Sequence, residues 1–331
     1  MSESNYRALP EPAERTQFRE RFEEYVDGEA YEFRPQIKAK LGIVIVSRHD
    51  ADLTLNCLNS IAPQLELNDA RVVVVHASDD AETAAEISSA LLEKQDGNTP
   101  VPTALSERTS LIEIGHCDTD TIAQKIALEF LKTENYLFAH PTATFPIGAI
   151  SALFDVLGRD KVAAVSPYLA GGPFAGSLVA HFGNWPINHR TEMLAGAGWK
   201  FPNAPERKEF ASRASMHCLL VRASALSEVG GLDDALSEPF SGADLSQKLL
   251  DAGYKIGFAP SAHVDFDDTA LEAALSEERF LQSRDKYYSE RLGGTFMPMA
   301  AWRFGRLLSS IADLFGNSLP HTHHPSMDHA K

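Results

Sequence analysis

The chain has little of what marks several common protein classes. It holds only three cysteines, Cys57, Cys117 and Cys218, and their separation does not match the spacing of a metal site. So sparse and odd a number predicts reduced thiols rather than a disulfide framework. No apolar run approaches the ~20 residues that a membrane-spanning helix needs. We therefore expect a cytoplasmic protein that is soluble or, at most, held peripherally at the inner face of a membrane.

Basic residues are also scarce. The 331 residues include 30 Lys and Arg against 46 Asp and Glu, which gives a net charge of −16. Such a surface repels the phosphates of DNA and RNA, so we expect no nucleic-acid partner. A single nucleotide is not excluded, because a few local donors can hold it. Hydrophobic residues make up 44% of the chain, enough for one large α/β core.

Glycine is missing where a dinucleotide-binding enzyme would need it. The apolar run at 41–46 predicts a buried strand, and the residues after it, 47–52, read SRHDAD. A dehydrogenase of the Rossmann type has a glycine-rich turn at this place, which cradles the pyrophosphate. A dinucleotide-dependent dehydrogenase is therefore disfavoured.

Strands and helices are predicted to alternate through the first half of the chain. The expected strands cover 41–46, 71–75, 111–114 and 136–139, and the expected helices cover 52–61, 82–94 and 119–132, with a polar loop at 95–110. Continuous β-branched runs are typical of a buried parallel sheet. Ligands bind such sheets beyond the carboxyl ends of the strands. The expected pocket is therefore lined by the loops at 47–50, 76–80, 115–118 and 140–145.

The second half continues the pattern with longer interruptions. A helix is expected from Pro146 to Gly158, strands at 162–167, 216–222 and 255–259, and helices at 223–229 and 244–252. Residues 170–212 have little periodicity and predict a long loop. Amphipathic helices are predicted at 11–26 and 299–315. Domain packing and a partner or membrane surface are both open roles for them. The histidine-rich end is expected to be a polar tail, with adventitious metal binding as the alternative.

Two segments carry a family resemblance. Residues 221–234 read VRASALSEVGGLDD, and residues 244–256 read DLSQKLLDAGYKI. Together they resemble the acceptor-side half of family-2 glycosyltransferases, close to rhamnosyltransferases. The resemblance implies a GT-A fold, which is an α/β fold with a Rossmann-like, mostly parallel sheet flanked by helices. It implies three parts: an N-terminal tail and helix at 1–38, the GT-A domain at 39–295, and a C-terminal helix and tail at 296–331.

The resemblance also implies a chemistry and a set of positions. The expected reaction is inverting transfer of a sugar from a nucleotide-sugar donor to a surface-glycan, polysaccharide or lipid-linked acceptor. The implied donor-binding positions are Ser47, Arg48, His76, Ser78, Asp79, Gly115, Lys125, His140 and Thr142. The implied acceptor-side positions are Gly230, Gly231, Asp233, Asp234 and His263. The segment 170–212 corresponds to the variable loop that shapes an acceptor site.

Several positions depart from the family pattern. His76 stands at the position of a nucleobase-contacting aspartate, and Lys125 at that of an asparagine. Thr142 replaces a metal-binding aspartate, and Phe266 stands where the family often has a metal-binding histidine. Threonine is a poor ligand for Mg²⁺ or Mn²⁺, so we expect no metal cofactor; either ion stays open as the alternative, without its usual ligand.

The catalytic base is displaced or missing. Ser241 and Gly242 fall on the Glu-Asp pair that carries the base in the family, and neither can take a proton at neutral pH. The candidates left are Glu238, Asp244 and Asp265. The rival interpretation is a catalytically inactive relative that binds a glycan, a nucleotide or a partner glycosyltransferase. Structural roles also stay open for His76 and His140, and a helix cap for Asp244.

Overall fold

The computed structural model describes residues 37–48, 50–92, 103–170, 210–211, 214–238, 240–266, 282–283, 285–287 and 289–290. The predicted helices at 11–26 and 299–315, the segment 171–209 and the histidine-rich tail lie outside these residues. None of the helices within the described ranges is long and apolar enough to cross a membrane.

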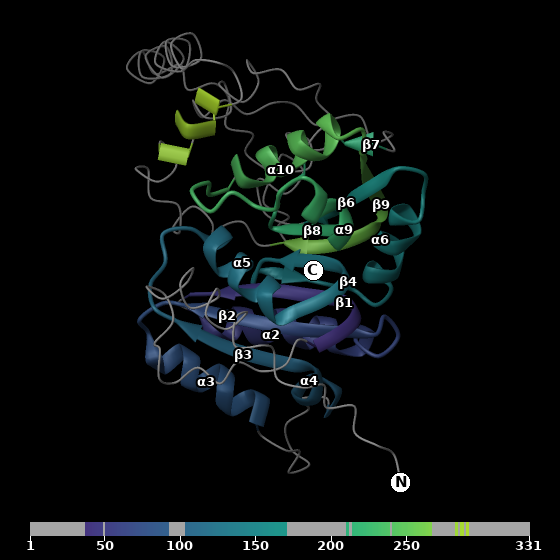
Figure 1. The fold of residues 1–331 in the computed structure, drawn as a ribbon. Helices are drawn as coiled ribbons and strands as arrows, with labels where there is room; N and C mark the ends of the chain where they lie inside the picture. The colour runs from purple at the N-terminus through teal and green to yellow at the C-terminus, as the bar shows by residue number, and fades with distance from the viewer. Residues whose placement is uncertain are drawn as a thin grey trace, which may run out of the picture.

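One curled, mixed sheet forms the centre of the protein (Figure 1). Its order is β3-β2-β1-β4-β8-β6-β9-β5, and the short β7 pairs with β9. The strands are β1 (Ile37–Ser47), β2 (Ala70–Ala77), β3 (Thr109–Ile114), β4 (Leu131–Ala139), β5 (Ala143–Thr144), β6 (Val162–Ala170), β7 (Phe210–Ala211), β8 (Cys218–Arg222) and β9 (Lys255–Phe266). The first four strands along the chain are parallel, and β8 runs antiparallel to its neighbours β4 and β6.

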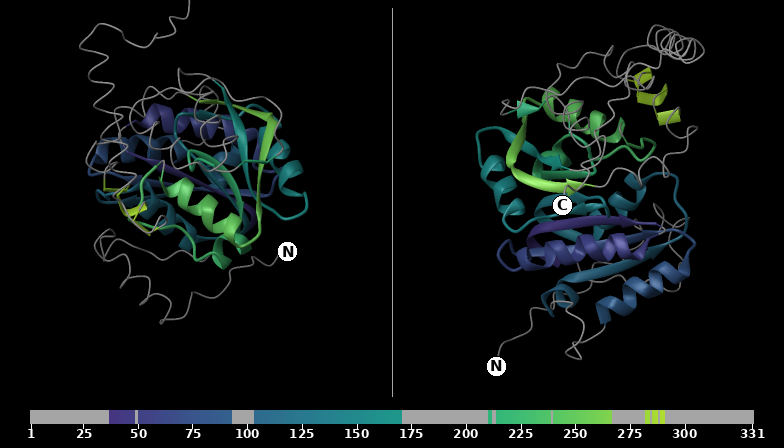
Figure 2. Two further views of the ribbon diagram at one scale, coloured as in Figure 1. Left: turned by 90° about the horizontal axis from the view of Figure 1, so that it is seen from above. Right: turned by 180° about the vertical axis from the view of Figure 1, so that it is seen from behind.

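Helices cover both faces of the sheet, as the views from above and behind also show (Figure 2). One face packs against α2 (Ala51–Ile61), η1 (Ala62–Gln64), α3 (Ala81–Leu92), α4 (Thr103–Arg108) and α6 (Ala149–Leu157). The other packs against α5 (Asp120–Phe130), α9 (Ala223–Glu228) and α10 (Phe240–Asp251). Successive side chains of a strand point to opposite faces, so Ile43 and Ile45 enter the first core while Val44 and Val46 enter the second. The continuous apolar run of β1 is explained by these two buried faces.

Strand register gathers the loops along one edge. Ser47 is aligned with His76, Ala77 with Ile114, and Ile45 with Ala139. The carboxyl ends of β1, β2, β3 and β4 therefore lie together. The antiparallel β8 begins at the same edge, because Cys218 pairs with Ala139.

Glycines end two of the helices in the signature segments. Gly231 has φ 75° and donates its amide to the carbonyl of Leu226 in α9. Gly253 has φ 83° and follows α10, and the amide of Tyr254 donates to Leu249. A left-handed residue just after a helix turns the chain away, and glycine adopts it without steric cost. The family spacing of these glycines is thus a spacing of helix ends.

Some predicted boundaries need correction. The loop expected at 95–110 contains α4, and β9 extends to Phe266 instead of ending at 259. The helix expected to reach 132 ends at Phe130, where β4 begins at once. The helix α10 starts at Phe240, four residues before the predicted start. Asp244 is therefore inside α10 and does not cap it.

Candidate functional site

A cavity of about 20 Å³ lies at the edge where β4 ends and β8 begins. Its lining residues come from β1, α5, the end of β4 and the segment after it, the residues just before β8, and the turn before α10 with the first turn of that helix: Val46, Asp120, Thr121, Gln124, Ala139, His140, Pro141, Met216, His217, Glu238 and Ser241. Two of the residues predicted from the sequence, His140 and Glu238, thus meet at one place. Gln124 and His217 also line it. Sequence analysis missed both, because the family pattern assigns no role to the position of Gln124, next to Lys125, or to that of His217.

Glu238 is one of two carboxylates that line this cavity, and the other, Asp120, is paired with Arg48. Oε1 of Glu238 accepts hydrogen bonds from the Met216 amide at 2.8 Å, the Ser241 hydroxyl at 2.9 Å and the Gly242 amide at 3.2 Å. Its Oε2 has one long contact among the described residues, with the Ser215 hydroxyl at 3.5 Å. One carboxylate oxygen is therefore fixed by the protein, and the other keeps capacity to accept a proton.

Gly242 makes room for this carboxylate. A Cβ on Gly242 would lie 2.4 Å from the carbonyl oxygen of Ala214 and 2.9 Å from Oε1 of Glu238. A contact of 2.4 Å with a backbone atom cannot be relieved by a side-chain rotation, so no aspartate fits at 242 in this backbone. Glu238 lies beside the place where the family has its base.

His140 is held in a fixed orientation. Its amide donates to the carbonyl of His217 at 2.7 Å, and its Nδ1 is 2.8 Å from the hydroxyl and 3.3 Å from the amide of Thr142. Burial, reinforced by the nearby His217, lowers the pKa of His140 to about 3, although Asp120 opposes the shift. His140 is therefore neutral at pH 7. Because Nδ1 accepts the Thr142 amide, we assign the ring proton to Nε2.

The positions that would hold a metal in the family are packed against one another. The Thr142 hydroxyl is hydrogen-bonded to His140. Phe266 is buried, with its ring centroid 5.8 Å from that of His140 and 5.7 Å from that of His217. A hydroxyl and a phenyl ring do not offer the charged oxygens that Mg²⁺ and Mn²⁺ prefer. Across the described ranges, no group of three or more His, Cys, Asp or Glu is placed to hold a metal ion. The residues present do not fit the divalent ion of the family.

Arg48 ties together the ends of the first three strands. Its guanidinium donates to Asp120 at 2.8 Å and to the carbonyls of Ala77 at 3.0 Å and Cys117 at 3.3 Å. Its side chain is 19% exposed. Burial lowers the pKa of Arg48, but Asp120 and Cys117 outweigh this effect, so the pKa is raised overall. Arg48 is a clamp of this edge as well as a predicted donor-binding residue.

The other predicted donor positions line the same edge. Ser47, which is buried, lies 2.9 Å from the Thr54 hydroxyl, and His76 contacts the carbonyl of Asp80 through Nε2 at 2.9 Å. Asp79 accepts from the amide of His116 at 3.2 Å. Two further positions lie close by: Ser78 accepts from the Asp80 amide at 3.3 Å, and a Cβ on Gly115 would be 3.7 Å from Asp79.

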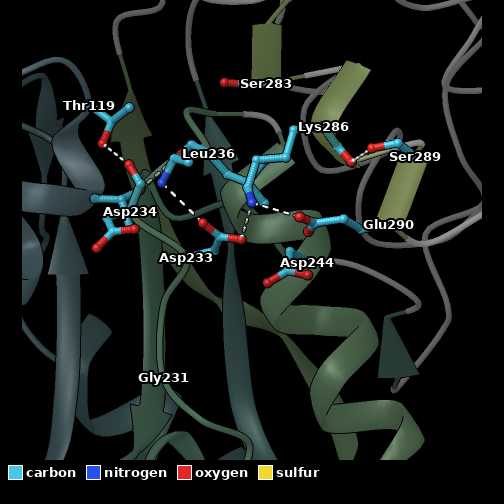
Figure 3. A network of polar contacts seen from close by, with 12 residues as sticks. Thr119, Gly231, Asp233, Asp234, Leu236, Asp244, Ser283, Lys286, Ser289 and Glu290 are labelled. Atoms are coloured by element: carbon cyan, nitrogen blue, oxygen red, sulfur yellow. Dashed lines mark hydrogen bonds and ion pairs between the residues drawn. The ribbon is translucent and has the colours of Figure 1, made fainter. Parts of the chain in front are cut away.

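The loop after Gly231 is docked on the start of α5. The Thr119 hydroxyl donates to the carbonyl of Asp234 at 2.7 Å (Figure 3). The Thr121 hydroxyl donates to the carbonyl of Leu236 at 2.8 Å. Lys125 forms an ion pair with the Asp234 side chain. These contacts join α5 to the loop that leads to Glu238, which lines the same cavity as His140.

A second support comes from residues 282–290. Figure 3 shows Lys286 between two carboxylates, 3.3 Å from Asp233 and 2.7 Å from Glu290. The hydrogen bond to Glu290 raises the pKa of Lys286. The hydroxyls of Ser283 and Ser237 are 2.8 Å apart. These contacts hold the loop on both sides, next to Glu238.

The two other candidate bases lie outside the cavity. Asp244 is buried on α10 and pairs with Lys248 at 2.7 Å. Asp265 is exposed on β9, where the neighbouring Phe266 points to the cavity side, and adjacent strand residues face opposite ways. His263 is exposed like Asp265, and its ring lies 5.0 Å from that of Tyr168.

Comparison with curated proteins gives one kind of relative. The N-acetylglucosaminyl-diphospho-decaprenol L-rhamnosyltransferase of Mycobacterium tuberculosis is 31% identical over 140 residues, and the same match occurs in two strains. The match covers 39% of this chain and 45% of the relative, so the chain spans less than half the length of the curated relatives it matches. No protein family profile matches the chain.

Solved structures confirm the fold. The mannosyltransferase PcManGT from Pyrobaculum calidifontis, in complex with GDP-Man and Mn²⁺, superposes with a TM-score of 0.55 and 13% identity, over 92% of this chain and 83% of that one. GalNAc-T7, solved with UDP, GalNAc and Mn²⁺, gives a TM-score of 0.55 at 10% identity, over 83% of this chain and 55% of that one. The predicted GT-A fold is therefore confirmed.

Proposed function

We propose that this chain, which has the fold of the GT-A glycosyltransferases, transfers a sugar from a nucleotide-sugar donor to a hydroxyl of a glycan or lipid-linked acceptor. The observation that carries the proposal is the placement of Glu238 in the cavity at the sheet edge, with one carboxylate oxygen fixed and the other open.

Glu238 is the proposed general base. Its Oε2 takes the proton of the acceptor hydroxyl as the hydroxyl oxygen forms a bond to the anomeric carbon of the donor sugar. The bond from that carbon to the diphosphate oxygen breaks, and its electron pair leaves with the nucleoside diphosphate. Attack opposite to the leaving group inverts the configuration. The Met216 and Gly242 amides hold Oε1 so that Oε2 stays in place.

The donor is proposed to lie along the edge formed by β1, β2 and β3, with its diphosphate toward His140. We propose that no divalent ion is needed, because Thr142 and Phe266 do not offer ligands for one. The Nε2 proton of the neutral His140 then donates a hydrogen bond to a diphosphate oxygen. The relatives that carry Mn²⁺ with their nucleotides would differ from this chain at that point.

The acceptor is proposed to be lipid-linked, as the name of the mycobacterial relative states for that protein. A lipid-linked acceptor implies that the enzyme works at a membrane surface. The segment 299–315, which lies outside the described residues, is the proposed contact with that surface.

Transfer is the direct test. The full chain is incubated with UDP-, GDP-, dTDP- and CMP-sugars and with N-acetylglucosaminyl-diphospho-decaprenol or a glycan acceptor, each with Mn²⁺ and with EDTA. We expect release of nucleoside diphosphate with one donor, undiminished in EDTA. A donor at ~100 times its dissociation constant adds ~2.7 kcal/mol of stability, so thermal shift detects binding without turnover. Binding without transfer would support the inactive alternative, and EDTA-sensitive transfer would refute metal independence alone.

A further inference from the structure

One buried side chain of the cavity has its polar group unsatisfied. Gln124 lies on α5 and is 9% exposed, and its Oε1 has no hydrogen-bond partner within the described part of the chain. Asp120 and Thr121 precede it by one helical turn and line the same cavity, so all three side chains share one face of α5. A buried amide oxygen without a partner costs stability, and such a group in a native protein calls for an explanation.

Gln64 shows how a structural glutamine is treated in the same molecule. It is 2% exposed, and its Oε1 accepts from the amides of Gly148 at 3.1 Å and Ile150 at 3.3 Å. Its Nε2 donates to the carbonyl of Phe145 at 3.3 Å. In Gln64, both polar atoms of a buried structural amide therefore have hydrogen-bond partners within the protein. Gln124 is not used in this way.

The cavity beside Gln124 sets the size of what would satisfy it. A volume of about 20 Å³ is enough to admit a group of the size of a water molecule or a hydroxyl. Its walls include groups that accept and groups that can donate a hydrogen bond: the Gln124 amide, the Glu238 carboxylate and the two imidazoles of His140 and His217. Such a lining suits a hydroxyl, which donates one hydrogen bond and accepts others.

We propose that this cavity is a subsite for one sugar hydroxyl, and that Gln124 is a specificity-determining residue that accepts a hydrogen bond from it. The inference rests on the proposed transferase function. Glu238 takes the proton of the reacting hydroxyl, while Gln124 recognises a different hydroxyl of the same or the partner sugar. A sugar that lacks the hydroxyl leaves Gln124 buried and unpaired, which is the discrimination that hydrogen-bonding sites make best.

The variant Gln124→Met tests the subsite by two measurements with opposite signs. Methionine keeps the length of the side chain and removes the unpaired amide. We expect the melting temperature of the ligand-free protein to rise by about 2–4 °C. The KM for the sugar that supplies the hydroxyl should rise about tenfold to a hundredfold. Gln64→Met is the matched control, and its melting temperature should fall because two amides and a carbonyl lose their partner.

Two arms identify the source of the hydroxyl. Calorimetry compares UDP-glucose with UDP and GDP-mannose with GDP, for wild type and Gln124→Met. Weaker binding of a sugar nucleotide with unchanged binding of the bare nucleotide assigns the hydroxyl to the donor. An unchanged donor affinity with a raised acceptor KM assigns it to the acceptor.

The failures are separable. One outcome is that wild type and Gln124→Met both transfer sugar, with a donor KM and an acceptor KM that each differ less than twofold between the two proteins. That result overturns the subsite and leaves the transferase function intact. A wild type that binds sugar nucleotides more tightly than nucleotides but transfers no sugar contradicts the transferase function. In that case the Gln124→Met affinities still decide the subsite. A wild type that binds none of the four probes and transfers no sugar contradicts both.

Discussion

Two pairs of residues along the same sheet edge differ in how the protein satisfies their polar atoms. Where β1, β2 and β3 end, Arg48 donates to Ala77, Cys117 and Asp120, and Asp80 accepts from Thr83 and Glu82. Those hydrogen bonds from Thr83 and Glu82 lower the pKa of Asp80. Where β4 ends and β8 begins, Gln124 Oε1 has no partner in the described ranges and Glu238 Oε2 has one long contact.

The difference separates polar groups that stabilise the fold from polar groups that stay available to a substrate. Hydrogen bonds made within the protein stabilise the fold, and a group that makes them is less available to a substrate. Groups left open cost stability and persist where function uses them. We therefore expect substitutions where β1, β2 and β3 end to act on stability and on donor affinity, and substitutions of Gln124 and Glu238 to act on the KM for the sugar and on turnover.

Glu238→Gln should show the largest effect. Glutamine keeps the size of the side chain and cannot take the acceptor proton, so turnover should fall by ~10²–10⁴-fold. Donor affinity should stay close to that of the wild type, because the base contacts the acceptor. The measurement is steady-state release of nucleoside diphosphate alongside donor calorimetry.

Asp265→Asn is the matched control for this variant. It also changes a carboxylate to its amide, at an exposed position away from the cavity. Its turnover should equal that of the wild type. Equal loss in both variants, or loss only in Asp265→Asn, would refute Glu238 as the base and leave the transferase assignment to be judged by the wild type.

The sheet was the easier part to predict from the sequence. A buried strand needs a run of apolar residues, and the end of a helix favours glycine. Both requirements fall on the residues concerned, so the sequence shows them directly for β1, β2, β3 and β4 and for the ends of α9 and α10. The helix α4 was missed because its six residues, TALSER, lie among loop-like neighbours. The early start of α10 was missed because Ser241 and Gly242 are weak helix formers whose place depends on packing.

The site could be predicted only in part, for a physical reason. Glu238 and His140 could be proposed because they stand near family motifs. Gln124 and His217 could not be proposed. They line one cavity only because α5 and the chain just before β8 lie at the same end of the strands, and this arrangement is not visible in any local sequence pattern. The need for glycine at 242 comes from the close approach of the Ala214 carbonyl, and Ala214 is far from Gly242 in the sequence.

Arg48→Met tests the stabilising role of the hydrogen bonds where β1, β2 and β3 end. Methionine keeps part of the apolar stem and leaves Asp120 and two carbonyls without their donor. We expect the free energy of unfolding to fall by about 2–4 kcal/mol, measured by denaturant titration. At a temperature where the variant is folded, its turnover per folded molecule should change far less than that of Glu238→Gln. A stable variant with a loss of turnover as large would place Arg48 in the chemistry instead.

The smallest expected effect concerns pH and the enclosure of His140. An unfolded histidine titrates near 6.5, whereas the pKa of His140 in the fold is lowered to about 3 by burial and by His217. Between these values the unfolded chain binds a proton that the folded chain does not, so stability is full above pH ~6.5 and falls as the pH drops toward 3. The loss reaches about 2 kcal/mol by pH 5. His140→Asn keeps an acceptor for Thr142 and removes the titration. Unfolding curves recorded from pH 7 to 5 should therefore converge for the two proteins as the pH falls, with the wild type losing more stability. Parallel curves would mean that His140 is open to solvent and that the stretch at β4 is less enclosed than its packing against Phe266 indicates.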